Sequence, residues 1–133
     1  MPKFITEWWP SALTALVILY ATLWPDPVGD TELMIFPGFD KLIHAIMMGG
    51  LTGAIYFDRR RSGRLLTLHY KILVALCVAV FAIADEYLQA LTNLGRAFEV
   101  WDILANLGGI LIAYFTAPPV VNRIFRSSSG HTT

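Results

Sequence analysis

Four long apolar stretches follow one another along the chain, with polar segments between them. They cover about residues 8 to 24, 39 to 57, 70 to 91 and 100 to 117. Each is close to the roughly 20 residues that a helix needs to cross the hydrocarbon of a bilayer. Backbone groups in lipid must be hydrogen-bonded within the chain, so each stretch is expected to be a helix. The pattern predicts an all-α polytopic membrane protein: a bundle of four transmembrane helices over residues 1–120, then a polar, disordered cytoplasmic tail over residues 121–133.

The composition agrees with this pattern. Of the 133 residues, 56% are hydrophobic and 15% are charged, whereas a typical soluble domain is about 25% charged. The net charge is zero. The chain therefore has no overall positive field that would attract nucleic acid, and no nucleic-acid partner is expected. The first stretch is followed by no small-x-small cleavage site, which favours a retained helix over a cleaved signal peptide.

Lysine and arginine are distributed unevenly among the polar segments. Between the second stretch and the start of the third lie Arg59, Arg60, Arg61, Arg64 and Lys71, and near the two termini lie Lys3, Arg123 and Arg126. In the segments after the first and third stretches, Arg96 is the only basic residue. Basic segments remain on the cytoplasmic side of a membrane. We therefore expect a multi-pass protein of the inner (cytoplasmic) membrane, surrounded by membrane lipids, with both termini in the cytoplasm.

Polar residues within the stretches gather at the ends that face outward in this orientation. The second stretch begins with Asp40, Lys41 and His44, the third ends with Asp85, Glu86 and Gln89, and the fourth begins with Asp102 and Asn106. Spacings of three and four residues place the members of each group on one helix face. Charged groups at this depth usually face the interior of a bundle or a wet cavity and pair with one another. A single polar layer beneath the outer surface is therefore expected.

A purely structural role is an alternative for several of these residues. Asp40 and Asp102 stand where carboxylates cap helix N-termini, and Lys41 could extend to the lipid head groups. Gln89 and Asn106 could join helices through interhelical hydrogen bonds. A network that only fixes helix packing therefore competes with a binding site.

The residue types restrict the chemistry of the layer. One histidine with several carboxylates suits zinc, manganese or iron, but the sequence has no HExxH motif and no second histidine or cysteine in the layer, so neither a metal nor another cofactor is expected. No serine lies there, which argues against a nucleophilic triad. A pocket for a polar head group needs only the donors and acceptors present. Lys41, His44 and Arg96 suit anionic groups, and Gln89 and Asn106 suit amides or hydroxyls.

The same residues carry a resemblance to a known family. The segments "DKLIHAIMMGGL", "ADEYLQAL" and "GRAFEVWDILANLGGILIAY" resemble the VanZ-like family of small bacterial membrane proteins over about residues 40 to 114. The matching positions are Asp40, Lys41, His44, Asp85, Glu86, Gln89, Arg96, Asp102, Asn106 and Gly109. The second stretch lacks the aromatic residues that are common after the histidine in that family. The resemblance implies a role in the cell envelope, and the family is named after a member linked to low-level resistance to the glycopeptide antibiotic teicoplanin.

Three hypotheses for function remain open. In the first, an outward-facing pocket recognises an envelope-related amphiphilic or lipid-linked ligand. Its lining residues would be Lys41, His44, Glu86, Gln89, Arg96, Asp102 and Asn106, supported by Asp40 and Asp85. In the second, the protein is a membrane-embedded hydrolase or transferase acting on such a molecule, with His44, Asp85 and Glu86 as acid and base. In the third, it is a structural or assembly subunit. A unit of this size could also act as a homo-oligomer.

Overall fold

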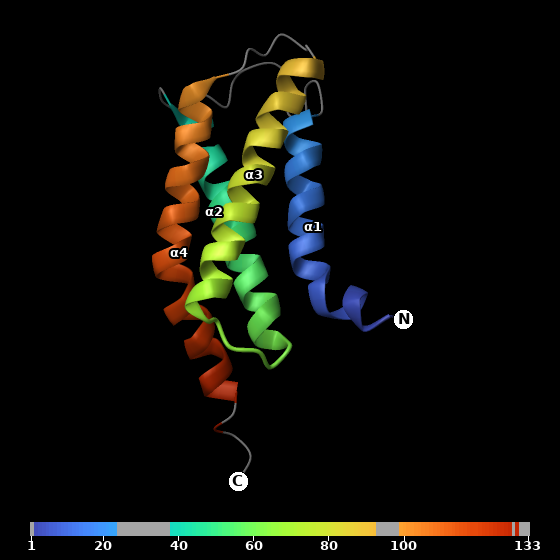
Figure 1. The fold of residues 1–133 in the computed structure, drawn as a ribbon, viewed down its shortest axis with the longest axis vertical. Coiled ribbons are helices and arrows are strands. Elements are labelled where there is room, and N and C mark those ends of the chain that lie inside the picture. Colours follow the sequence, from blue (N-terminus) through green and yellow to red (C-terminus); the bar gives the residue numbers. More distant parts are fainter. Residues whose placement is uncertain (1, 24–37, 93–98, 129, 131–133) are drawn as a thin grey trace.

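Four helices form the part of the chain that the structure describes. The computed structural model describes residues 2–23, 38–92, 99–128 and 130, and within them it contains no strand. The helices are α1 (Lys3–Leu23), α2 (Phe39–Arg61), α3 (Leu68–Thr92) and α4 (Val100–Ser128). They run alternately up and down, so that α1 and α3 end where α2 and α4 begin (Figure 1). The prediction of an all-α four-helix protein is confirmed.

The two ends of the bundle differ in chemistry. We call the end at which α2 and α4 begin the polar end; it carries Asp40, Lys41, His44, Asp85, Glu86, Gln89, Glu99, Asp102 and Asn106. We call the opposite end the arginine end; it carries Arg59, Arg60, Arg61, Arg64, Arg123 and Arg126. Both α1 and α3 begin, and α2 and α4 finish, at the arginine end (Figure 1).

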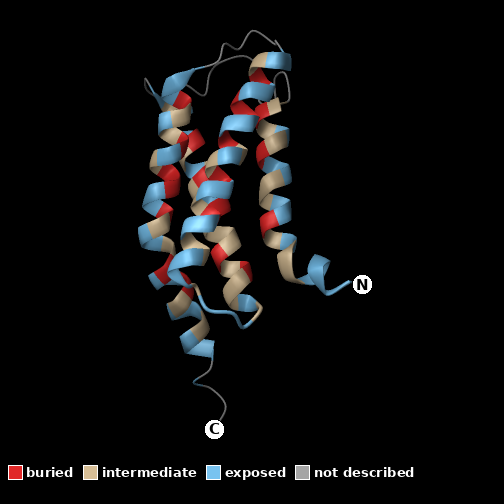
Figure 2. Cartoon of the chain, in the orientation of Figure 1, coloured by how far each residue is buried: buried red, intermediate tan, exposed pale blue. Residues whose placement is uncertain are grey.

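Three of the helices, α1, α3 and α4, are long and apolar enough to cross a membrane. They expose large apolar side chains, such as Leu16, Leu76 and Leu111, and buried residues lie on the faces that the helices turn toward one another (Figure 2). The fourth, α2, is not among these three helices. It packs against each of the others, most extensively against α4, and it buries polar residues such as Thr52 and Asp58. The other helices therefore cover much of α2, including the side chains of Thr52 and Asp58.

The close contact between α2 and α4 depends on two glycines. A Cβ added to Gly109 in α4 would overlap the backbone of Ala45 in α2, and one added to Gly49 would lie 3.0 Å from the carbonyl oxygen of Gly109. By contrast, a Cβ at Gly50 or Gly108 would meet nothing within 4 Å. Small residues at a helix interface allow backbones to approach in this way. The glycines therefore set the distance between these two helices.

The fourth helix is longer than the sequence pattern predicted. It continues through Pro118 and Pro119 to Ser128, whereas the apolar stretch was expected to end near residue 117. The prediction of a disordered tail is therefore wrong for residues 121–128, which are helical. Val121 is buried, and the ring of Phe125 packs on that of Phe57 in α2, with centroids 5.3 Å apart. These apolar contacts, one helical turn apart, stabilise the added turns.

Pro10 lies inside α1, near its start, and α1 bends near its N-terminal end (Figure 1). Pro10 has no N–H, so in an α-helix the carbonyl of Thr6 loses its usual donor. The Arg61 guanidinium of α2 donates to this carbonyl at 2.7 Å and to that of Glu7 at 2.8 Å. Arg61 therefore supplies a donor that the proline lacks.

The buried carboxylate of Asp58 completes this junction between α1 and α2. Its Oδ2 accepts hydrogen bonds from the backbone N of Ser11 at 2.9 Å and from the Ser11 hydroxyl at 2.5 Å. Its Oδ1 lies 3.8 Å from Arg61 Nη2. We call Ser11, Asp58 and Arg61 the proline clamp, because together they hold the proline-containing turn of α1 against α2.

Candidate functional site

Lys41 joins three carboxylates at the rim of the polar end. Its Nζ lies 3.2 Å from Asp102 Oδ1, 3.3 Å from Asp40 Oδ2 and 3.3 Å from Glu99 Oε2. Asp40 and Glu99 are half-exposed, whereas Asp102 is mostly buried. Sequence reasoning did not select Glu99, although its spacing of three residues from Asp102 was an available signal. Lys41 therefore links α2 to the beginning of α4 rather than only extending toward solvent.

Beneath this rim, side chains from three helices converge in a buried group that we call the inner triad: His44 of α2, Glu86 of α3 and Asp102 of α4. Each is buried, and one nitrogen or oxygen atom from each lies within 4.8 Å of those of the other two. His44 Nε2 lies 4.0 Å from Asp102 Oδ2. An imidazole and two carboxylates at these distances can share a proton or hold a cation.

A second polar contact joins α3 to α1. The Thr22 hydroxyl donates to Asp85 Oδ1 at 2.7 Å, and Gln89 Nε2 donates to Asp85 Oδ2 at 3.1 Å and to Glu86 Oε2 at 3.5 Å. Asp85 and Gln89 are both buried. Sequence reasoning missed Thr22; its position near the outward end of the first apolar stretch was the available signal. Asp85 thus joins α3 to α1 through Thr22 and also accepts a hydrogen bond from Gln89 of its own helix.

Two buried polar side chains at the polar end have atoms without a hydrogen-bond partner among the residues the structure describes. Asn106 is fully buried, and neither its Nδ2 nor its Oδ1 is hydrogen-bonded. His44 Nδ1 is likewise buried without a partner. Asn106 lies one helical turn after Asp102, on the same face of α4. These atoms are therefore free to bind something outside the described part of the chain.

The structure gathers eight of the nine predicted site residues at one end. Arg96, the ninth, lies outside the described residues. Among the described residues, the polar end carries the five carboxylates of Asp40, Asp85, Glu86, Glu99 and Asp102 beside the cationic Lys41 and the imidazole of His44. This excess of carboxylates favours a cation over an anion.

A comparison with known families agrees with this arrangement. The VanZ/LLP1 family model matches residues 3–125, a range that includes α1, α2, α3, most of α4 and all residues of the inner triad. The chain belongs to the VanZ/LLP1 family. No curated protein and no solved structure matches it. Together with the apolar helices, the match identifies a VanZ-type membrane protein.

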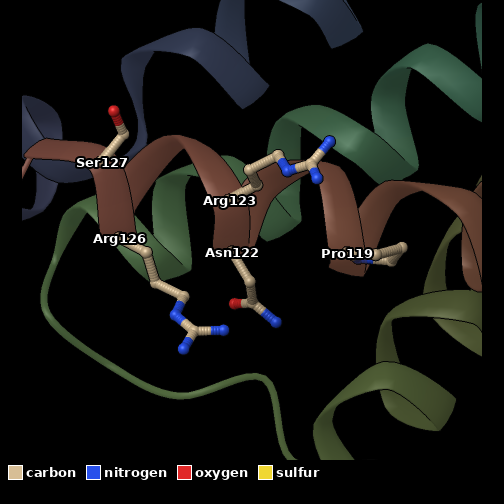
Figure 3. Close-up of a pocket in the computed structure, with 5 residues that line it drawn as sticks. All are labelled: Pro119, Asn122, Arg123, Arg126 and Ser127. Atoms are coloured by element: carbon tan, nitrogen blue, oxygen red, sulfur yellow. The ribbon is translucent and has the colours of Figure 1, made fainter.

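The VanZ/LLP1 chain also has a pocket at the arginine end. It is lined by Pro119, Asn122, Arg123, Arg126 and Ser127. All five come from α4, and Figure 3 shows the side chains of Arg123 and Arg126 extending in different directions. Groups from one helix that point apart do not enclose a ligand, so we place the candidate site of this VanZ/LLP1 protein at the polar end.

The Thr22 contact gives a prediction about how the VanZ/LLP1 bundle is held together. Thr22→Val removes the interhelical bond to Asp85 and should lower the free energy of unfolding by about 0.6–2 kcal/mol, the range for such bonds in membranes. SDS-induced unfolding in mixed micelles measures this. Thr52→Val is the matched control, because the buried Thr52 hydroxyl bonds only to Met48 O within α2. Equal losses in the two variants would contradict a specific role for Thr22.

Proposed function

We propose that this VanZ/LLP1 protein crosses the cytoplasmic membrane four times, with both termini in the cytoplasm. We further propose that its polar end recognises the head group of an envelope-related amphiphilic or lipid-linked molecule on the outer side. The segregation of charge supports this orientation, because arginine-rich ends remain on the cytoplasmic side. The polar end then lies beneath the outer surface, where envelope precursors are exposed. The contacts that α2 makes with all three other helices support its inclusion as the fourth span.

Asn106 is the observation that carries the binding proposal. A buried polar atom without a partner costs about 1–3 kcal/mol, and two atoms of Asn106 have no partner within the described part of the chain. A network that served only to fix helix packing would be expected to satisfy them. An external head group that offers a hydroxyl or amide would satisfy both the donor and the acceptor of this side chain.

Lys41 at the rim of the polar end also supports the binding of a head group. The Lys41 ammonium, about one third exposed, can donate to a ligand oxygen while it holds Asp102, and Arg96 stays a predicted contributor. The family resemblance adds a link to teicoplanin resistance to the proposal. Teicoplanin carries a lipid tail and acts at the outer surface, so a head-group site on that side would lie where the antibiotic and its targets meet.

The binding proposal is tested by native mass spectrometry of the full chain purified with its lipids. Wild-type protein should carry a reproducible bound species, and Asn106→Leu, which keeps nearly the same volume without the amide, should reduce its occupancy at least about tenfold, the effect of losing roughly 1.4 kcal/mol. Thr52→Val, a buried polar change in the middle of α2, should retain the species. An unchanged species in Asn106→Leu, or no species in the wild type, would refute the proposal.

The inner triad favours an enzyme as the second candidate function. Ligand atoms of His44, Glu86 and Asp102, one from each residue, lie within 4.8 Å of one another, a separation that one water molecule can bridge for proton transfer, and such groups support acid–base hydrolysis or transfer. The same experiment separates the two functions. Binding leaves the mass of the captured species constant during incubation, whereas an enzyme converts it with time, and Glu86→Gln stops the conversion.

A further inference from the structure

The Lys41 ammonium offsets part of the charge of the inner triad through Asp102, but no lysine or arginine of the described residues forms an ion pair with Glu86. Two carboxylates, from Glu86 and Asp102, are buried beside the imidazole of His44, with one ligand atom of each residue within 4.8 Å of those of the other two. Like charges at such distances repel strongly where water is excluded. A cation between them removes the repulsion and uses the imidazole as a further ligand.

The geometry suits one ion. Two atoms bound to the same zinc ion at about 2.0–2.2 Å can lie no more than about 4.4 Å apart. His44 Nε2 and Asp102 Oδ2, at 4.0 Å, already meet this limit. Since all three ligand atoms lie within 4.8 Å of one another, small rotations of the side chains bring the third into range.

Neighbouring residues orient the two carboxylates. Lys41 Nζ holds Asp102 Oδ1 at 3.2 Å, which leaves Oδ2 as the oxygen nearer His44. Gln89 Nε2 lies 3.5 Å from Glu86 Oε2 and is itself held by Asp85 at 3.1 Å. Outer contacts of this kind fix the direction of metal ligands and raise metal affinity.

A second, independent observation points to a ligand at this place. His44 is more than nine-tenths buried, and its Nδ1 has no hydrogen-bond partner among the described residues. Asn106, on the Asp102 face of α4, is fully buried, and no described residue bonds to either atom of its amide. The Asn106 amide can contact a water molecule or an anion that completes the coordination of an ion. In the neighbouring group of Asp40, Glu99 and Asp102, two carboxylates are half-exposed to water, and the Lys41 ammonium lies within 3.3 Å of all three. That group therefore needs a bound cation less than the inner triad does.

We propose that His44, Glu86 and Asp102 bind a divalent transition-metal ion such as zinc or manganese. An imidazole with two carboxylates selects these metals over calcium, which prefers six to eight oxygen ligands. Three protein ligands leave at least one coordination position for water or for a ligand oxygen. The ion would also offset the excess of carboxylates and so admit an anionic head group such as a phosphate. The admission of an anionic head group rests on the proposed function, whereas metal binding itself does not.

The test uses full-length protein in detergent, stripped with a chelator and titrated with zinc alone. Elemental analysis should give about one zinc per chain, and competition with a chromogenic chelator should give an affinity that falls at least about tenfold, as for disrupted metal sites in general, in Glu86→Gln and in His44→Gln. Glu99→Gln, which removes a rim carboxylate, is the matched control and should bind zinc like the wild type.

X-ray absorption spectroscopy of the zinc-loaded wild type tests the site without any variant, so its result does not depend on whether the variants fold. Its spectrum should contain scattering from one imidazole and from oxygen ligands at about 2.0–2.2 Å. Absence of stoichiometric zinc, a spectrum without imidazole, or unchanged affinity in folded Glu86→Gln and His44→Gln would overturn the metal site. Native mass spectrometry without added zinc reports separately on the head-group proposal, so the two can fail independently.

Discussion

Asp58→Ala should lower the free energy of unfolding by about 3 kcal/mol or more, because it removes the acceptor of two hydrogen bonds to a charged group, each worth about 1.5–3 kcal/mol. The backbone N–H and the hydroxyl of Ser11 would then be left in a buried position without an acceptor. The proline-containing turn of α1 would lose its main attachment to α2. SDS-induced unfolding of the purified protein, followed by far-ultraviolet circular dichroism, measures the loss.

Two further variants show whether the proline clamp is responsible. Asp58→Asn keeps one carbonyl oxygen as an acceptor for Ser11, so its stability should lie between those of Asp58→Ala and the wild type. Asp40→Ala removes a half-exposed carboxylate at the other end of the same helix and should change the stability by only about 0–1 kcal/mol. If Asp58→Ala unfolds at the same SDS fraction as Asp40→Ala, the clamp does not stabilise the bundle.

Gly109→Ala should also be strongly destabilising, although it adds a single methyl group. The new Cβ would overlap the backbone of Ala45, and backbone cannot rotate out of the way as a side chain can. Helices α2 and α4 would have to separate, and overpacking of this kind typically costs about 1–3 kcal/mol. The separation would also widen the distance between His44 and Asp102, so zinc affinity should fall together with stability.

Gly108→Ala is the matched control for the helix contact. A Cβ at Gly108 meets nothing within 4 Å, and alanine is favoured over glycine inside a helix by about 1 kcal/mol. This neighbouring variant should therefore be as stable as the wild type or more stable, in the same unfolding assay. Equal destabilisation at residues 108 and 109 would contradict the close approach of α2 and α4.

The helices could be predicted from the sequence because long apolar stretches allow few alternatives in a membrane. Two features could not. The fourth apolar stretch was expected to end near residue 117, whereas α4 continues through Pro118 and Pro119, with Phe125 packed on Phe57. The inner position of α2 was also not foreseen, because which helix is covered by its neighbours depends on tertiary contacts that no single stretch contains.

The polar layer was predictable for a different reason. Spacings such as that of Asp102 and Asn106 place two side chains on one face, and the alternating direction of the helices brings three such faces to one end. Buried polar residues outside these spaced groups were not predicted. Thr22 has no polar neighbour at helical spacing in its stretch, and Asp58, which begins an arginine-rich run, resembled a solvated loop residue rather than a buried anchor for α1.

The pairing of α2 with α4 has a consequence for biosynthesis. The helix with the least apolar sequence packs most extensively against α4, which is synthesised after the other three described helices. Until α4 emerges, the side of α2 that carries His44 and Gly49 has lipid or a chaperone as its neighbour, and only α1 and α3 can shield the rest. Nascent chains that stop after α3 should therefore be held by insertion factors or degraded, and completion of α4 is the event that closes the bundle.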